Sequence, residues 1–175
     1  MPELGPSPLM TGGDSLDVAA ARAAIAAAIR PIDGRETLPL RQALGRVLAE
    51  DVISPIDVPA HDNSAMDGYA FAGSALADGA ETVLRVAATV HAGDVPTMTT
   101  APGDCVRIMT GAVMPPGLDT VVPQELCRLE GGRIRIAPGT LRAGDNRRLR
   151  GEDLSRGRPA VAAGRRLRPA DLGLI

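Results

Sequence analysis

The sequence contains no lysine and no tryptophan, and it has one tyrosine and one phenylalanine, Tyr69 and Phe71. Apolar residues still make up 45% of the 175 positions, with alanine and valine prominent among them. The core must therefore be built mainly from small aliphatic side chains. This composition favours thin layers and short strands over a wide interior.

An excess of charge of one sign is also missing. The 19 basic residues are all arginine and face 21 acidic residues, for a formal net charge of −2. Proteins that bind nucleic acid or an anionic membrane usually present a strong basic excess, so the balance argues against both partners. Arginine favours bidentate contact with oxyanions, but its exclusive use is more simply explained by coding bias.

Cysteines and long hydrophobic runs are scarce. Cys105 and Cys127 are the only cysteines, and neither has another Cys or a His at metal-ligand spacing, so both are predicted to be buried free thiols. No basic start leads into an apolar segment, and no apolar run approaches the length of a membrane span. These absences predict a cytoplasmic protein.

The chain begins with a segment rich in Pro, Gly and Ser, residues 1–14, which is predicted to be a disordered tail. Ser15 can then cap a helix from Leu16 to about Arg30, and Pro31 prevents its continuation. This N-terminal helix is assigned to residues 15–34. Its apolar positions need a partner surface.

Short extended segments dominate the rest of the chain. Residues 36–48 suggest a short strand followed by a short helix, and another extended stretch starts at Val52 and Ile53. Further strands are predicted at 82–91, 105–109, 120–124, 133–136 and 160–163, separated by Gly- and Pro-rich connections. Pro169 is placed to open a final helix. This spacing suggests a compact β-barrel or sandwich.

Three segments carry side chains suited to chemistry. The first, His61 to Tyr69, crowds short polar side chains into a loop between extended segments, although Asp62, Asn63 and Ser64 can equally bond their own backbone in a turn. The second runs from Arg107 to Ala112 and contains Thr110 and Gly111. A hydroxyl and free amides at a strand end could hold an oxyanion, but a strand that simply ends at glycine is commoner.

The third segment runs from Asn146 to Asp153 and places three arginines just before two carboxylates. Guanidinium groups suit phosphate, and carboxylates could hold a divalent cation that bridges phosphates. A solvated turn in which opposite charges neutralise one another explains the same pattern. The residues alone do not decide between these interpretations.

Together these segments resemble one protein family. His61–Ala70, Val106–Ala112, Val121–Glu125 and Arg147–Ser155 match, in order and approximate spacing, the N-terminal half of molybdopterin molybdenumtransferases, known as MoeA in bacteria and as the C-terminal domain of gephyrin in animals. The run Asp-Asn-Ser-Ala-Met-Asp-Gly-Tyr is the most specific part of the match. The resemblance extends from about Leu16 to Ile175.

The resemblance implies an α+β fold that is mostly β. A small β-barrel-like domain, residues 53–153, would be inserted into an elongated α/β domain formed by residues 35–52 and 154–175, with the N-terminal helix before it. The family's pterin-binding domain, with its Gly-Gly-Val-Ser type motif, is absent from this sequence. The unfinished apolar end of the chain is therefore expected to reflect truncation.

The resemblance also implies an activity. Family members insert molybdate into adenylylated molybdopterin with release of AMP, using Mg²⁺, and they work as homodimers that receive substrate from a molybdopterin adenylyltransferase. Residue by residue, it assigns catalytic roles to Asp67 and Thr110, and ligand binding to Arg148, Ser64 and Asn63, with no metal ligand assigned. Glu152 and Asp153 are expected to be structural. Leu149 interrupts an arginine run that is continuous in some members.

Two hypotheses about the function of the chain follow. In one, the chain is part of a molybdenum-inserting enzyme and is inactive alone. In the other, it is a non-catalytic dimerisation or docking module of the same pathway. The apolar C-terminal segment and the unpartnered helix favour the first, because a self-sufficient module should cover both surfaces.

Overall fold

The structure is a computed structural model that describes residues 17–175. The chain divides into two units, with the boundary along the sequence between Thr37 and Leu38. The predicted tail and the proposed Ser15 cap lie outside the described residues. No helix within residues 17–175 combines the length and the apolar character needed to cross a membrane.

The first unit contains helix α1 (Val18–Ala28). Asp17 is its N-cap, and the Asp17 carboxylate accepts the Ala20 amide at 2.7 Å. The prediction of a start at Leu16 was therefore wrong by two residues, because an aspartate reaches a free amide of the first turn as well as a serine does. None of the helix residues is buried.

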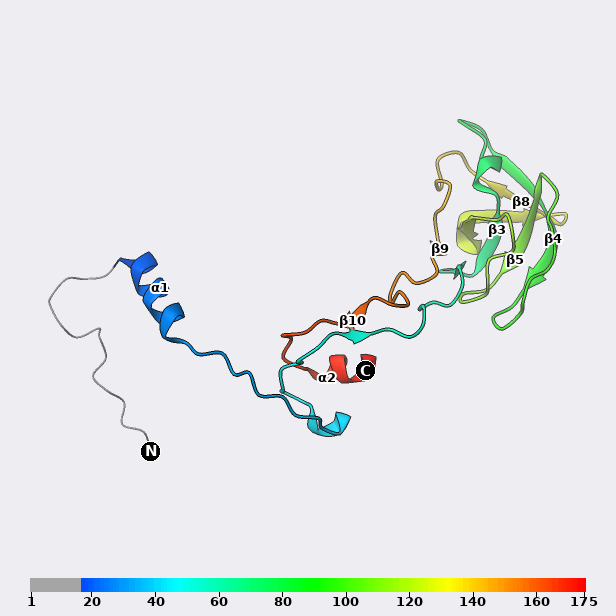
Figure 1. Cartoon of the computed structure of the whole chain (residues 1–175). Helices are drawn as coiled ribbons and strands as arrows, with labels where there is room; N and C mark the ends of the chain where they lie inside the picture. Colours follow the sequence, from blue (N-terminus) through cyan, green and yellow to red (C-terminus); the bar gives the residue numbers. More distant parts are fainter. Residues whose placement is uncertain (1–16) are drawn as a thin grey trace, which may run out of the picture. The chain divides into compact units, whose positions relative to one another are not determined.

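The second unit is built around a six-stranded sheet with the order β6-β3-β5-β4-β8-β7. Its strands are β3 (Gly68–Phe71), β4 (Thr82–Val90), β5 (Asp104–Ile108), β6 (Thr120–Pro123), β7 (Cys127–Glu130) and β8 (Arg133–Ile136). Neighbours are antiparallel except for β4 and β5, which run parallel. The sheet is curled, not flat (Figure 1).

Alternating side chains of this sheet build two apolar clusters. Ala70 packs in one cluster with Val106, Ile108 and Val121, whereas Tyr69 and Phe71 belong to the other. The second cluster also contains Leu84, Cys105, Val122, Ile134 and Ile136. Successive residues of a strand point to opposite faces, which explains this division. The prediction of a core dominated by aliphatic side chains is confirmed.

Two short ladders join distant parts of the chain. Strand β1 (Val52–Ile53) pairs with β10 (Pro159–Val161), and β2 (Asn63–Ser64) pairs with β9 (Arg147–Arg148). An isolated bridge links Val47 to Arg166. The segments on either side of 53–153 are therefore bonded to one another, while the division of the chain into domains stays a prediction.

The connections between strands contain 3₁₀ turns, and a short helix follows the last strand. The turns are η2 (Leu40–Gln42), η3 (Gly73–Ala75) and η4 (Gln124–Leu126). The strand predicted within residues 36–48 is absent apart from the isolated bridge at Val47, and the short helix predicted there is the single 3₁₀ turn η2. Pro39 precedes η2 and cannot donate a backbone hydrogen bond, and Gly45 takes a positive φ of 78° that an α-helix cannot use.

Helix α2 (Pro169–Leu174) confirms the predicted start at Pro169. The buried Asp171 carboxylate accepts the Arg168 amide at 2.8 Å and pairs with Arg165 at 2.8 Å. These contacts fix the first turn, where an acidic side chain also interacts favourably with the helix dipole.

Candidate functional site

Strand β2 brings the three segments singled out in the sequence into contact. Asn63 is paired with Arg148, and Ser64 with Arg147. On the other side of β2, the Gly111 amide donates to the Ser64 carbonyl at 2.9 Å, and the Ser64 amide donates to Ala112 at 3.0 Å. The structure thus joins the 61–69, 107–112 and 146–153 segments through backbone hydrogen bonds.

Ser64 has a local role. Its hydroxyl is buried, donates to the Met66 carbonyl at 2.6 Å and accepts the Met66 amide at 3.2 Å. This is the serine turn that the residues alone suggested. It bends the chain immediately before Asp67.

Asp67 and Thr110 form a close polar pair on exposed loops. Both the amide and the hydroxyl of Thr110 donate to Oδ1 of Asp67, each at 2.7 Å. Hydrogen bonds to the charged form stabilise it, so the Thr110 hydroxyl, and after it the Thr110 amide, lower the pKa of Asp67. Asp67 is therefore ionised at neutral pH, and its Oδ2 accepts no hydrogen bond from residues 17–175.

Gly68 fixes the position of this pair. A Cβ at Gly68 would lie 2.0 Å from the carbonyl oxygen of Val122, so only glycine permits the approach of β3 to β6 seen here. The Gln124 amide continues the same contact by donating to the Asp67 carbonyl at 3.0 Å. Asp67 is consequently held by backbone contacts on both sides.

The amides at the end of β5 are not free, contrary to the expectation of an oxyanion cradle. The Thr110 amide bonds Asp67, the Gly111 amide bonds Ser64, and the Ala112 amide bonds the Met109 carbonyl at 2.9 Å. The Thr110 hydroxyl also directs its proton to Asp67. An anion at this site would need donors from elsewhere.

The arginines of the third segment are paired with carboxylates. Arg148 bonds both Glu152 and Asp153, and these contacts raise its pKa, with Glu152 the larger cause. Glu152 also accepts the Leu149 amide at 2.8 Å. The expectation that the two carboxylates serve the local structure agrees with these contacts.

Arg147 and Arg150 reach acidic residues of the segment that leads into β2. Arg150 binds Asp57 at 2.6 Å, and its amide donates to Asp62 at 2.8 Å. Arg147 lies 3.7 Å from Asp62. Of the two interpretations of the charge pattern, mutual neutralisation describes the geometry in this structure.

Asn63 retains an unused acceptor. Its Oδ1 is buried and has no hydrogen-bond partner, the one such side-chain atom found within residues 17–175. A buried acceptor without a donor is costly, so this oxygen is suited to accept from water or a ligand. Asn63 is the predicted ligand-binding residue with the clearest vacant polar atom.

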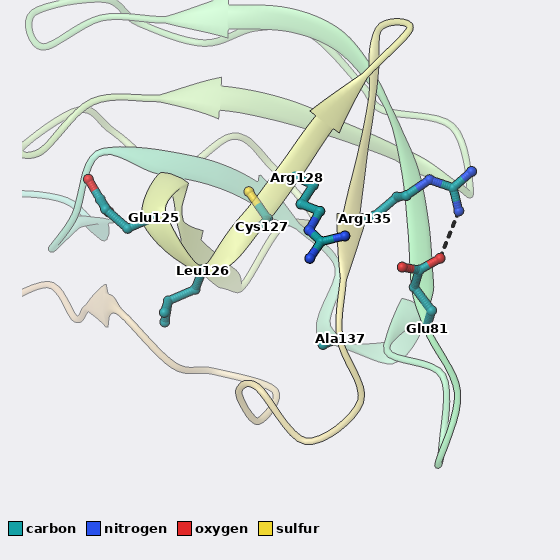
Figure 2. A pocket seen from close by; sticks show the side chains of 7 residues that line it. All are labelled: Glu81, Glu125, Leu126, Cys127, Arg128, Arg135 and Ala137. Carbon is teal, nitrogen blue, oxygen red and sulfur yellow. Dashed lines mark hydrogen bonds and ion pairs between the residues drawn. The ribbon is translucent and has the colours of Figure 1, made fainter.

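Two pockets in the described residues lie away from Asp67 and Thr110. A pocket of about 350 Å³ is lined by residues of η4, β7 and β8, among them Cys127, Arg128 and Arg135, and by Glu81 just before β4 (Figure 2). A smaller one of about 200 Å³ contains Arg150 and Asp57. Neither includes Asp67 or Thr110, whose surroundings are open, so the candidate site is defined by its polar contacts.

Neither cysteine nor metal chemistry is built into the described residues. Burial raises the pKa of Cys105 to about 12, which makes its thiol inert, while Cys127 is only half-buried, against the prediction that both are buried. Within residues 17–175, no three His, Cys, Asp or Glu side chains are grouped to hold a metal ion. These residues do not on their own fit a magnesium site.

Comparison with solved structures defines the class of fold. The chain is similar to the molybdopterin biosynthesis moeA protein of Pyrococcus horikoshii, with 34% identity and a TM-score of 0.70 over 83% of this chain and 39% of that one. A second structure of the Pyrococcus protein gives a TM-score of 0.64 at 35% identity, over 78% of this chain and 36% of that one. The mostly β fold with a curled sheet is therefore that of MoeA proteins.

Sequence comparison defines the family. Residues 16–175 match the family described as MoeA N-terminal region (domain I and II). The chain is 41% identical to the molybdopterin molybdenumtransferase of Haemophilus influenzae over 80% of this chain and 34% of that enzyme. It is 39% identical to molybdopterin molybdenumtransferase 2 of Mycobacterium tuberculosis over 84% of this chain and 36% of that enzyme. The chain belongs to the MoeA N-terminal family, and it spans about a third of the length of these relatives.

Proposed function

We propose that this chain supplies one wall of the site at which an enzyme of molybdenum cofactor biosynthesis inserts molybdate into adenylylated molybdopterin and releases AMP. The observation that carries the proposal is the Asp67–Thr110 pair, with both hydrogen bonds at 2.7 Å, linked through β2 to the segment that holds Arg148. Relatives that are 41% and 40% identical over 80% of this chain are named molybdopterin molybdenumtransferase, which supports the proposal.

In this proposal Asp67 acts as a fixed negative charge. Because Thr110 lowers the pKa of Asp67, the carboxylate is a weak proton acceptor at neutral pH. It is better suited to orient a group that carries a proton or a positive charge, through its free Oδ2. Thr110 then positions the carboxylate, and the Asn63 Oδ1 supplies a second acceptor.

Arg148 is proposed to contribute positive charge near the phosphate or molybdate. Its guanidinium already binds Glu152 and Asp153, so direct contact with an anion requires that one of these bonds be exchanged. Ser64 contributes by holding the turn that leads to Asp67. Mg²⁺ would take its ligands mainly from phosphate oxygens and water, because the described residues offer no grouped set of ligands.

To test the proposal, this chain replaces the corresponding third of the Haemophilus influenzae enzyme, and molybdenum incorporation by the resulting hybrid, the exchanged enzyme, is measured. Asp67→Asn should lower the rate about a hundredfold or more, because the positioned charge is lost while the shape is kept. Asp94→Asn is the matched control, since Asp94 is also exposed and accepts a backbone amide, from His91 at 2.7 Å. Activity within a few-fold of the parent for Asp67→Asn would remove Asp67 from the mechanism.

The chain alone is proposed to be inactive, because it covers about a third of its relatives. The same assay on the unfused chain checks this directly. Measurable turnover without the remaining two thirds would refute it.

A docking or dimerisation role is the second candidate, and one observation favours it. Helix α1 buries none of its residues, and Val18, Ile25 and Ile29 are 74%, 57% and 62% exposed. We infer that these side chains contact another surface, such as a second copy in a homodimer. Sedimentation of the chain and of its Ile25→Asp variant tests this, since an unchanged monomer in both cases would exclude self-association.

A cytoplasmic location and delivery of substrate by a molybdopterin adenylyltransferase complete the proposal. Both are proposed from the family resemblance, and the names of the relatives support the biosynthetic role on which they depend. Cross-linking the exchanged enzyme to the Haemophilus adenylyltransferase tests the second point. Absence of any cross-linked product would count against direct delivery.

A further inference from the structure

Arg107 differs from the arginines of the predicted ligand-binding segment. Arg147, Arg148 and Arg150 each lie against at least one carboxylate. Arg107 is exposed on β5, and its guanidinium makes no hydrogen bond or ion pair within residues 17–175. Of these four cations, Arg107 is the one whose donors remain unused.

The register of the sheet places Arg107 beside the candidate site. Arg107 is directly opposite Tyr69 in the antiparallel pair of β3 and β5, so the two side chains share a face. The Gln124 amide donates to the Asp67 carbonyl at 3.0 Å, which continues the β3–β6 pairing to Asp67, two positions before Tyr69. Because side chains alternate along a strand, Asp67 is expected on the same face as Tyr69. In agreement, the charge of Arg107 adds to the Thr110 hydrogen bonds in lowering the pKa of Asp67.

The site needs such a cation. An ionised Asp67 repels an anionic substrate, and the Thr110, Gly111 and Ala112 donors are already engaged within the protein. An unpaired guanidinium within electrostatic reach offsets this repulsion. It also offers the forked donors that suit a tetrahedral oxyanion.

We propose that Arg107 is the anion-binding residue of the Asp67–Thr110 site and receives a tetrahedral oxyanion, either a phosphate group or molybdate. This inference rests on the proposed function, and it assigns to Arg107 the direct contact that the resemblance gives to Arg148. The inference depends on one juxtaposition. The unpaired Arg107 guanidinium lies near the Asp67 carboxylate, and the donors of Thr110, Gly111 and Ala112 around it are already used within the protein.

The test titrates the 175-residue chain at low ionic strength with sodium molybdate and, separately, with inorganic pyrophosphate. The backbone amide signals of Thr110 and Gly111 report binding in NMR spectra. Arg107→Gln should weaken the affinity about tenfold or more, as expected for loss of charge-assisted hydrogen bonds, and Arg107→Lys should restore part of it. A response to one anion and not to the other identifies which oxyanion the residue receives.

Arg128→Gln is the matched control, because Arg128 is an exposed arginine of the same sheet without a hydrogen bond or ion pair in the described part of the chain. It should leave the titration unchanged. Equal affinities of the parent and Arg107→Gln, or no shift at Thr110 with either anion, would overturn the inference.

Activity of the exchanged enzyme separates this inference from the proposal on which it rests. If Asp67→Asn abolishes molybdenum incorporation while Arg107→Gln retains it, the assignment of Arg107 fails and the proposed function stands. If both variants lose activity and only Arg107→Gln also loses anion affinity, the inference is supported. Parental activity of Asp67→Asn would refute the proposed role of Asp67, whereas the anion titration of Arg107→Gln would still decide the assignment of Arg107.

Discussion

The six-stranded sheet and the paired segments 54–64 and 145–158 are stabilised by different physics. In the sheet, Phe71, Ile108 and Ile134 are fully buried, and long ladders connect the strands. In the paired segments, strands of two residues are supplemented by contacts such as Arg150 with Asp57. The sheet therefore depends on apolar burial, which salt and pH affect little, and the paired segments depend on charge and backbone hydrogen bonds.

This difference matters for the candidate site, because the site lies where the two regions meet. Asp67 immediately precedes β3 of the sheet, whereas Asn63 and Ser64 belong to the β2–β9 ladder of the paired segments. Perturbing the sheet should affect the position of Asp67, whereas perturbing the paired segments should affect Asn63 and Ser64.

Phe71→Ala should cause the largest loss. Phe71 is fully buried in the apolar cluster with Leu84 and Ile136, and removing a buried aromatic ring costs about 3–5 kcal/mol of unfolding free energy. Urea unfolding measures this. Leu129→Ala, at a position 57% exposed in the same sheet, is the control and should change stability by about 0.5 kcal/mol or less. Similar losses for both would refute the assignment of the cluster as core.

Gly68→Ala should have a smaller effect on stability but a specific effect on the site. The added Cβ meets the Val122 carbonyl and forces β3 away from β6, at a cost of about 1–3 kcal/mol. The amide signal of Gln124 should shift, because the Gln124 amide bonds Asp67. Gly173→Ala is the control, since a Cβ there meets nothing within 4 Å. An unperturbed Gln124 signal would show that the close approach is not required.

Asp57→Asn should reveal the pH dependence of the paired segments. The Arg156 amide, and then Arg150, lower the pKa of Asp57 below its usual value of 3.8. Because the folded pKa is depressed, the stabilisation is present above pH 3.8 and is lost as the pH falls through the lower folded value. Melting temperatures from pH 7 to pH 2 should therefore fall less steeply at the acid end for Asp57→Asn than for the parent. If the melting temperatures of Asp57→Asn and of the parent fall equally steeply at acid pH, Asp57 does not contribute to this pH dependence.

Thiol labelling probes the sheet without altering stability. Burial raises the pKa of Cys105 to about 12, whereas Cys127 is half-buried on the edge strand β7. Burial also raises the pKa of Cys127, so labelling is expected to be slow but confined to this residue. One thiol should react in the native protein at pH 8 and two in urea. Rapid labelling of Cys105 would show that the interior opens readily.

The sequence predicted several strands of the sheet and missed others that depend on their partners. Residues 133–136 were assigned as a strand, and β8 has these bounds, with Ile134 and Ile136 buried and the two arginines exposed. Strand β7 was missed because Arg128, Leu129 and Glu130 are all exposed and show no alternation. Strand β9 was missed because two arginines carry no strand signal and pair only through β2.

The site was predictable as three segments but not as a set of contacts. The polar character of residues 61–69 and the strand end at Thr110 are visible in the sequence, and the family resemblance singles out Asp67 and Thr110. That these two residues bond each other depends on the register of β3 against β5, which local patterns do not encode. The free amides expected after β5 are engaged for the same reason.

The ladder between β1 and β10 has a consequence for how the chain folds. Val52 and Val161 are paired although more than one hundred positions separate them. Closing a loop of that length in an unfolded chain costs on the order of 4 kcal/mol of entropy, more than a ladder of two or three residues returns. Once the intervening sheet has formed, its two ends already lie together through β2 and β9, and the remaining loop is short. The contacts around Asp67 should therefore assemble before the ends of the chain are joined, and a destabilised β1–β10 ladder should change the unfolding rate more than the folding rate.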